Sequence, residues 1–170
     1  MKLNLRLTAL CLCTLMLAPA AMRADQKVAV EKYAVGSTVA TFSAQDQYEK
    51  AFKFEPGPTF LVVAFDMSSA KKANGKLNAL GESFLDDNKA VYLSDIHGMP
   101  GVGRIFALPK MKKYKHRIIL GDTKGLLDPF PQKEDHLTIL RLDSQAKILE
   151  IQYWDPEKGD IAALLKTSDK

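Results

Sequence analysis

The spacing of hydrophobic residues changes several times along this chain, and each change predicts a different structural element. Residues 59–65 form a continuous apolar run that is rich in β-branched and aromatic side chains and ends at Asp66. Such a run is typical of a central strand that is buried on both faces of a sheet. Residues 90–95 have the same character, so they predict a second central strand.

Between these two runs the apolar residues follow the period of a helix. They recur at alternating steps of three and four residues, which places them on one helix face: Ala70, Ala73, Leu77, Leu80 and Phe84. The helix can be capped by Asp66, Ser68 or Ser69, and residues 86–88 are expected to end it. A strand, a helix and a second strand in this order predict two parallel strands joined by a crossover.

Five more strands and two helices are expected in the rest of the chain. Residues 39–42 and 51–54 predict one hairpin, residues 137–142 and 148–153 predict another, and residues 117–120 predict a short strand.

The two helices are expected at residues 100–113, where Pro109 can interrupt the helix, and after Asp155-Pro156, with Asp155 as the cap. This order of elements predicts an α/β fold: one domain over residues 25–170, with a central mixed β-sheet and helices on both faces.

The first 24 residues have the pattern of a secretory signal peptide. Lys2 and Arg6 precede an apolar run at residues 7–17, which is too short to span a membrane as a helix. Small residues follow, and cleavage is expected after Ala20, Ala21 or Ala24. We therefore expect a periplasmic protein with no stable membrane insertion after cleavage.

Cysteine and charge exclude several classes of function. Cys11 and Cys13 both lie inside the apolar run, so a chain cleaved there has no cysteine and can form neither a disulfide nor a reactive thiolate. Removal of residues 1–24 takes away three basic residues and no acid, which lowers the net charge from +4 to +1. No nucleic-acid partner is expected for a chain so close to neutral.

The order of elements, with these residues, resembles the thioredoxin-like superfamily, and within it the exported branch related to peroxiredoxins and thiol-disulfide reductases. The resemblance covers about residues 36–166. Gly36, Phe42 and Asp46 match the N-terminal segment of that branch, residues 60–66 match the strand before its active-site helix, and residues 117–122 and 138–143 match two strands that end in Asp. It implies a thioredoxin-like three-layer fold.

Residues 94–100 and 106–112 look like a group of small exported bacterial proteins, some of them labelled FAD/FMN-containing dehydrogenases. The chain has no Gly-rich dinucleotide-binding loop, so we expect no cofactor.

This sequence departs from the superfamily at the redox site. The position of the C-x-x-C motif is occupied by residues 66–71, which contain no cysteine, and His136 stands where the cis-proline is expected. Because no thiolate exists in the cleaved chain, disulfide exchange and cysteine peroxidase chemistry are excluded. The resemblance therefore implies a thioredoxin-like protein that lacks the C-x-x-C motif.

The first candidate site is the turn after the first central strand. Asp66, Met67, Ser68 and Ser69 lie at the carboxyl end of that strand and at the start of a helix, where α/β sheets commonly bind ligands. The plainer interpretation is a helix cap.

The second candidate site follows the neighbouring strand. His97 and Met99 point to one side if the chain is extended, and an imidazole with a thioether suits copper. The plainer interpretation is a loop histidine. Because parallel neighbouring strands end at the same edge, we expect Met67, Ser68 and Ser69 to lie beside His97 and Met99.

The sequence thus favours an exported binding or accessory module without thiol chemistry, whose partner is a small ligand or a periplasmic protein. Two alternatives remain open: a cofactor-dependent oxidoreductase, as the label above implies, and a copper carrier that uses His97 and Met99. A Ser68–His97–Asp95 hydrolase is disfavoured because the G-x-S-x-G motif is absent. The basic segment at residues 110–115 is expected to be a solvated helix end.

Overall fold

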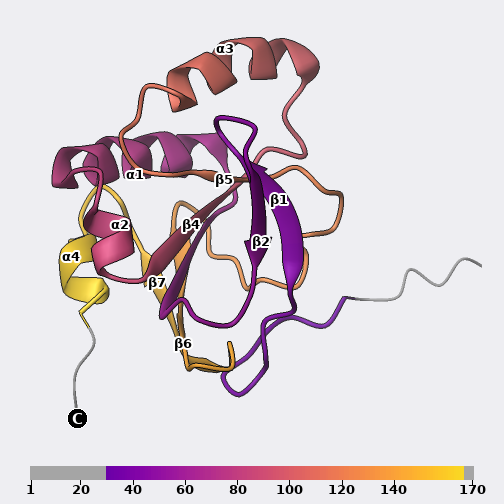
Figure 1. The fold of residues 1–170 in the computed structure, drawn as a ribbon, viewed down its shortest axis with the longest axis vertical. Coiled ribbons are helices and arrows are strands. Elements are labelled where there is room, and N and C mark those ends of the chain that lie inside the picture. The colour runs from indigo at the N-terminus through magenta and orange to yellow at the C-terminus, as the bar shows by residue number, and fades with distance from the viewer. Residues whose placement is uncertain (1–29, 167–170) are drawn as a thin grey trace, which may run out of the picture.

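The structure, a computed structural model, describes residues 30–166. The predicted signal peptide, residues 1–24, and both cysteines lie outside the described residues. The strands are β1 (Phe42–Asp46), β2 (Ala51–Phe54), β3 (Phe60–Ala64), β4 (Ala90–Asp95), β5 (Ile119–Gly121), β6 (Leu137–Leu142) and β7 (Ile148–Trp154). The helices are α1 (Met67–Leu80), α2 (Phe84–Asp87), α3 (Gly101–Met111) and α4 (Ile161–Leu164) (Figure 1).

The seven strands form one mixed sheet in the order β2-β1-β5-β4-β3-β6-β7. At its centre β3 pairs in parallel with β4, with Ala64 opposite Ser94, and antiparallel with β6. Every residue of β3 is buried, as expected for an apolar run without alternation. The predicted mixed sheet and the parallel pair of central strands are confirmed.

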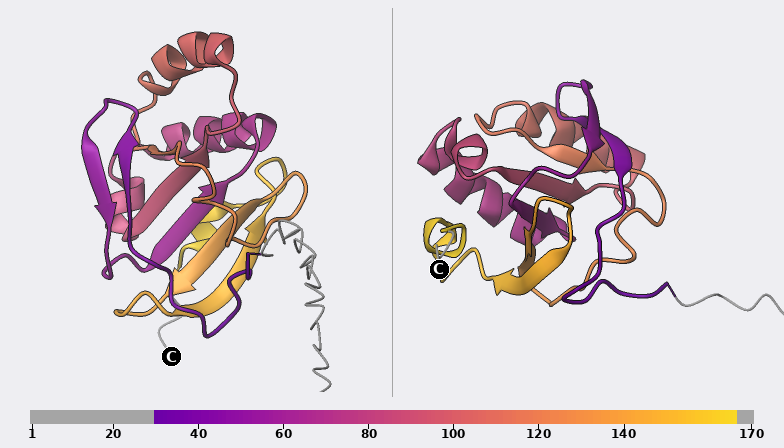
Figure 2. Two further views of the ribbon diagram at one scale, coloured as in Figure 1. Left: turned by 90° about the vertical axis from the view of Figure 1, so that its right-hand side faces the viewer. Right: turned by 60° about the horizontal axis from the view of Figure 1, so that its bottom comes forward.

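Alternate residues of β3 belong to two separate cores. Phe60, Val62 and Ala64 point toward a core that contains buried residues of all four helices. Leu61 and Val63 point toward the opposite core, whose buried residues come from strands and irregular segments. In Figures 1 and 2 the helices accordingly lie to one side of the central strands, with α3 next to α1.

The expectation of helices on both faces is therefore met on one face only, within residues 30–166. The second face is covered by the segment before β1 and by residues 122–136, which place Leu127 and Phe130 in the core. That covering segment contains Gly125, Pro129 and Pro131, which favour turns, and the two prolines lack the N–H that a helix needs.

Several elements begin or end at other residues than the sequence predicts. The first helix stops at Leu80 because Gly81 adopts a positive φ of 102°, so Phe84 belongs to a separate helix and Leu80 is exposed. The first strand is residues 42–46 rather than 39–42, although Val39 is buried. Pro109 does not interrupt α3, which continues to Met111.

The last helix is displaced from its predicted start. Residues 155–159 form a turn in which the amide of Gly159 donates to the carbonyl of Asp155 at 2.8 Å. The indole Nε1 of Trp154 donates to the carbonyl of Gly159, which holds this turn against the buried ring. Asp160, not Asp155, caps α4 by accepting a hydrogen bond from the amide of Ala162. No helix among residues 30–166 is long and apolar enough to cross a membrane.

A fully buried histidine connects the helical layer to the sheet. Nε2 of His116 lies 2.9 Å from Oδ1 of Asn74 in α1, and because an amide oxygen only accepts, the ring donates. Nδ1 of His116 is buried without a hydrogen-bond partner. A second ring proton would therefore be left unpaired away from water, and burial lowers the pKa of His116 to about 4.

This histidine should make the protein less stable in mild acid. A histidine in the unfolded chain titrates near pH 6.5, so between that value and pH 4 the unfolded state binds more protons and stability falls as pH falls. We expect the free energy of unfolding to be about 2 kcal/mol lower at about pH 5 than at about pH 7.5. Urea titrations at the two pH values measure this difference.

The His116→Gln variant, which cannot titrate, should lose most of this difference. His97→Gln, at an exposed histidine, should keep it. An equal pH dependence in wild type and His116→Gln would show that His116 is not the group responsible.

Candidate functional site

The carboxyl ends of β3 and β4 lie side by side and set the position of the candidate site. Asp66 follows β3 and caps α1, with its Oδ1 accepting a hydrogen bond from the amide of Ser69 at 2.8 Å. Ser69 is buried beneath this cap. The plainer interpretation of this turn, a helix cap, is therefore confirmed for Asp66.

A pocket of about 380 Å³ opens between α1 and α3, above the end of β4. One wall is α1, the floor is the end of β4 with the loop after it, and the other wall is α3. The residues that line it are Met67, Ala70, Lys71, Asn74, Ser94, Asp95, Ile96, Met99, Gly103, Phe106, Ala107, Lys110, Met111 and Tyr114.

The structure brings together some of the residues that the sequence singles out. Met67 and Met99, far apart in the chain, line the same pocket. Asp66, Ser68, Ser69 and His97 are not part of the lining.

His97 is exposed, and its Nδ1 lies 2.8 Å from the carbonyl oxygen of Asp122, to which it donates. His97 and Met99 therefore do not share the pocket. Among residues 30–166 no group of three or more His, Cys, Asp or Glu side chains is placed to hold a metal ion.

Much of the pocket comes from a helix whose role the sequence did not indicate. Phe106, Ala107 and Lys110 of α3 form one wall, and Met111 at its end is buried. Lys110 is exposed, as expected for a solvated helix end, and it also lines the same pocket as Met67. Val102 and Ile105 on this helix are about 70% exposed and Met111 is buried, so mainly the end of the helix packs into the core.

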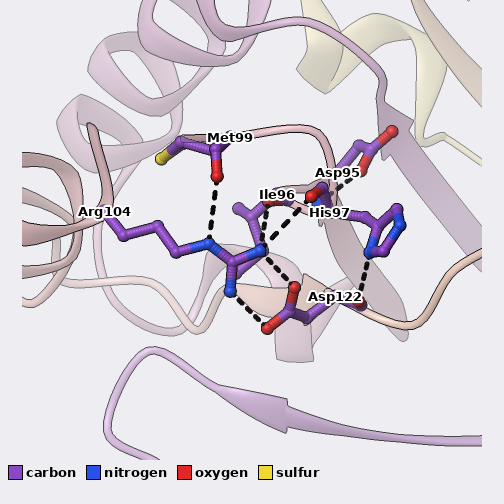
Figure 3. Close-up of polar contacts among 6 residues, drawn as sticks. All are labelled: Asp95, Ile96, His97, Met99, Arg104 and Asp122. Atoms are coloured by element: carbon purple, nitrogen blue, oxygen red, sulfur yellow. Dashed lines mark hydrogen bonds and ion pairs between the residues drawn. The ribbon is translucent and has the colours of Figure 1, made fainter. Parts of the chain in front are cut away.

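An arginine holds the loop after β4 in place (Figure 3). Nε of Arg104 donates to the carbonyl of Met99, and Nη2 donates to the carbonyl of Ile96 at 2.9 Å. The guanidinium also contacts both carboxylate oxygens of Asp122, the residue after β5, at 2.6 and 2.5 Å. This two-pronged geometry is one that lysine cannot reproduce.

The ion pair has an electrostatic signature. The hydrogen bond from Arg104 holds the pKa of Asp122 below its usual value, and the same contact raises the pKa of Arg104. The amide of His97 donates to Oδ1 of Asp95 at the start of the loop after β4, and Arg104 donates to the carbonyl of Met99 at the end of this loop. The arginine thus ties the start of α3, and with it one wall of the pocket, to the ends of two sheet strands.

Comparison with known proteins identifies the fold. No protein-family model matches the chain, and no curated protein matches its sequence. The thioredoxin domain of a thiol-disulfide oxidoreductase from Bacteroides vulgatus matches with a TM-score of 0.53 at 16% identity, over 79% of this chain and 100% of that one.

Two further solved structures match over most of their length. A thiol:disulfide interchange protein from Bacteroides sp. has a TM-score of 0.52 at 14% identity, over 81% of this chain and 93% of that one. A peroxiredoxin-like protein from Aquifex aeolicus has a TM-score of 0.55 at 8% identity, over 81% and 86%. The chain thus has the thioredoxin-like α/β fold that the resemblance implies.

Removal of the guanidinium should loosen the pocket wall without unfolding the sheet. We expect Arg104→Gln to increase the hydrogen-exchange rates of the amides of residues 97–103 by about threefold or more. In wild type, local opening must break the contacts of Arg104 to Asp122 and to the loop carbonyls, and the variant lacks these contacts. Amides of β3 and β4 should exchange as in wild type.

The matched control is Arg104→Lys, which keeps the positive charge but cannot contact both carboxylate oxygens of Asp122 as the guanidinium does. Its exchange rates in residues 97–103 should lie between those of Arg104→Gln and those of wild type. Exchange rates in residues 97–103 that are unchanged by Arg104→Gln would show that the loop does not depend on this contact.

Proposed function

We propose that this protein is an exported binding module with a thioredoxin-like fold and no thiol redox activity, and that it binds its ligand in the pocket between α1 and α3. One observation carries the proposal. The edge where parallel strands end, and where α/β sheets commonly bind ligands, here opens into a mostly apolar pocket with no cysteine in its lining.

The absence of thiol chemistry follows from the composition of the chain. The first turn of α1 consists of Met67, Ser68, Ser69 and Ala70, and no cysteine occurs after Cys13. Exchange of a disulfide needs an attacking thiolate, which a serine hydroxyl cannot replace. The cap that Asp66 forms also occupies the amide of Ser69, so this turn serves the helix itself.

The size and lining of the pocket suit a small molecule. A volume of about 380 Å³ lies within the range of roughly 300–1,000 Å³ that is typical of ligand sites. Apolar and thioether side chains dominate the lining, and a few polar groups stand among them, from Lys71, Asn74, Ser94, Asp95 and Lys110. Such sites bind through apolar contact and orient the ligand with a few polar groups.

Export is part of this proposal and rests on the sequence alone. The basic start, the short apolar run and the small residues at positions 18–24 support a cleaved signal peptide and a periplasmic location. The mass of the protein purified from the periplasm tests this directly, because cleavage after Ala20, Ala21 or Ala24 gives three different masses. Cleavage at any of these sites removes both cysteines.

The protein cleaved at any of these sites should have no thiol-dependent activity. In an insulin-reduction assay and in a peroxide-consumption assay its turnover should equal the rate of the buffer, since it holds no thiol that can be oxidised and reduced again. A thioredoxin run in parallel serves as the positive control. Turnover above the buffer rate by the pure cleaved protein would contradict the proposal.

Filling the pocket should abolish ligand binding. Ala107 lines the pocket on α3, and Ala107→Trp places an indole in it, whereas Val102→Trp adds the same ring to the exposed side of the same helix. We expect native mass spectrometry of the protein from the periplasm to show a bound small molecule in wild type and Val102→Trp, but not in Ala107→Trp. A bound molecule of the same mass on all three proteins, or on none of them, would overturn the assignment of the pocket.

A further inference from the structure

We infer that the pocket is built for an anion with an apolar body, such as a medium-chain carboxylate. This inference rests on the proposed function and names the class of its ligand. It follows from three features of the lining: the thioether and aromatic surface, two lysines without acidic partners, and a buried amide with a free donor.

The body of the pocket is apolar and adaptable. Met67, Met99 and Met111 come from the start of α1, the loop after β4 and the end of α3, and they meet at one pocket. Unbranched thioether side chains pack against irregular or flexible apolar groups better than branched side chains do. Phe106, which is 65% exposed, extends this apolar surface to the mouth of the pocket.

Lysines stand on both walls, Lys71 on α1 and Lys110 on α3. Among residues 30–166 neither forms an ion pair, whereas their near neighbours do: Lys72 pairs with Glu157 at 2.8 Å and Lys112 pairs with Glu49 at 3.2 Å. Lys71 and Lys110 therefore bring to the pocket two positive charges that no carboxylate of the described residues pairs with.

The acid in the pocket does not neutralise these lysines. Asp95 is the acidic residue of the lining, and its Oδ1 already accepts the amide of His97. The lining thus has an excess of positive charge, which favours an anion and disfavours a cation.

Asn74 provides a further donor on the same wall as Lys71. The residue is only 4% exposed and lines the pocket, and its Oδ1 accepts from His116. Its Nδ2 group donates in none of the hydrogen bonds between residues 30–166, and it is not one of the fully buried polar atoms that lack a partner, so it remains accessible at the pocket. Hydrogen bonds to charged acceptors are stronger than those to neutral ones, so a carboxylate oxygen suits this donor.

The test compares three probes with the same eight-carbon chain: octanoate, octanol and octyltrimethylammonium. Amide chemical shifts of the cleaved protein are followed during titration with each probe. We expect octanoate and octanol to change the amide chemical shifts of pocket residues, and octanoate to bind with about five- to tenfold higher affinity than octanol. The cation should change the shifts of none of these residues.

The charge preference should depend on the two unpaired lysines. Lys71→Gln with Lys110→Gln should lower the affinity for octanoate to that for octanol and leave octanol unchanged. The matched control, Lys72→Gln with Lys112→Gln, removes the same charge from paired lysines and should keep the preference. In wild type, raising NaCl from about 0.05 M to about 0.5 M should weaken octanoate binding several-fold and leave octanol binding unchanged.

The outcomes separate this inference from the proposed function. Equal affinity for octanoate and octanol, both lost in Ala107→Trp, would overturn the anion preference and leave the pocket as a binding site. If neither octanoate nor octanol perturbs the pocket residues, both the inference and its basis, the use of this pocket for an apolar ligand, are wrong. Octanoate binding that survives in Ala107→Trp would place the anion elsewhere and overturn the inference alone.

Discussion

The parallel pairing of β3 with β4 is the constraint on which the candidate site depends. β3 is buried along its whole length, between β4 and β6 in the sheet and between two cores across it. A strand in that position cannot shift by one residue without exchanging the side chains of the two cores. The register therefore places the starts of α1 and of the loop after β4 at one edge, where Met67 and Met99 meet.

The second wall of the pocket is positioned by polar contacts more than by burial. Met111 is the buried residue of α3, so hydrophobic packing holds mainly the end of this helix. Its beginning is held by Arg104, whose guanidinium donates both to carbonyls of the preceding loop and to the carboxylate of Asp122. Because those contacts are partly exposed, we expect the start of α3 to open more easily than the sheet.

The same scaffold position can serve different chemistry according to which groups occupy it. In the superfamily that the sequence resembles, the turn after the first central strand carries the C-x-x-C motif. In this chain Asp66 caps the helix there and Met67 contributes a thioether to the pocket. This turn holds no cysteine, and the binding function that we propose relies instead on the apolar surface of the pocket and the charges of Lys71 and Lys110.

The sequence by itself determined the central elements, because a long apolar run and a helical period each have one stable arrangement. It predicted β3, β4 and the buried positions Ala70, Ala73 and Leu77 of α1, and it holds no cysteine after Cys13. Only the tertiary structure decided which face carries the helices, where α4 begins and which lysines lack partners. Those features depend on contacts between distant residues, such as Trp154 with Gly159 or Arg104 with Asp122, which local spacing does not encode.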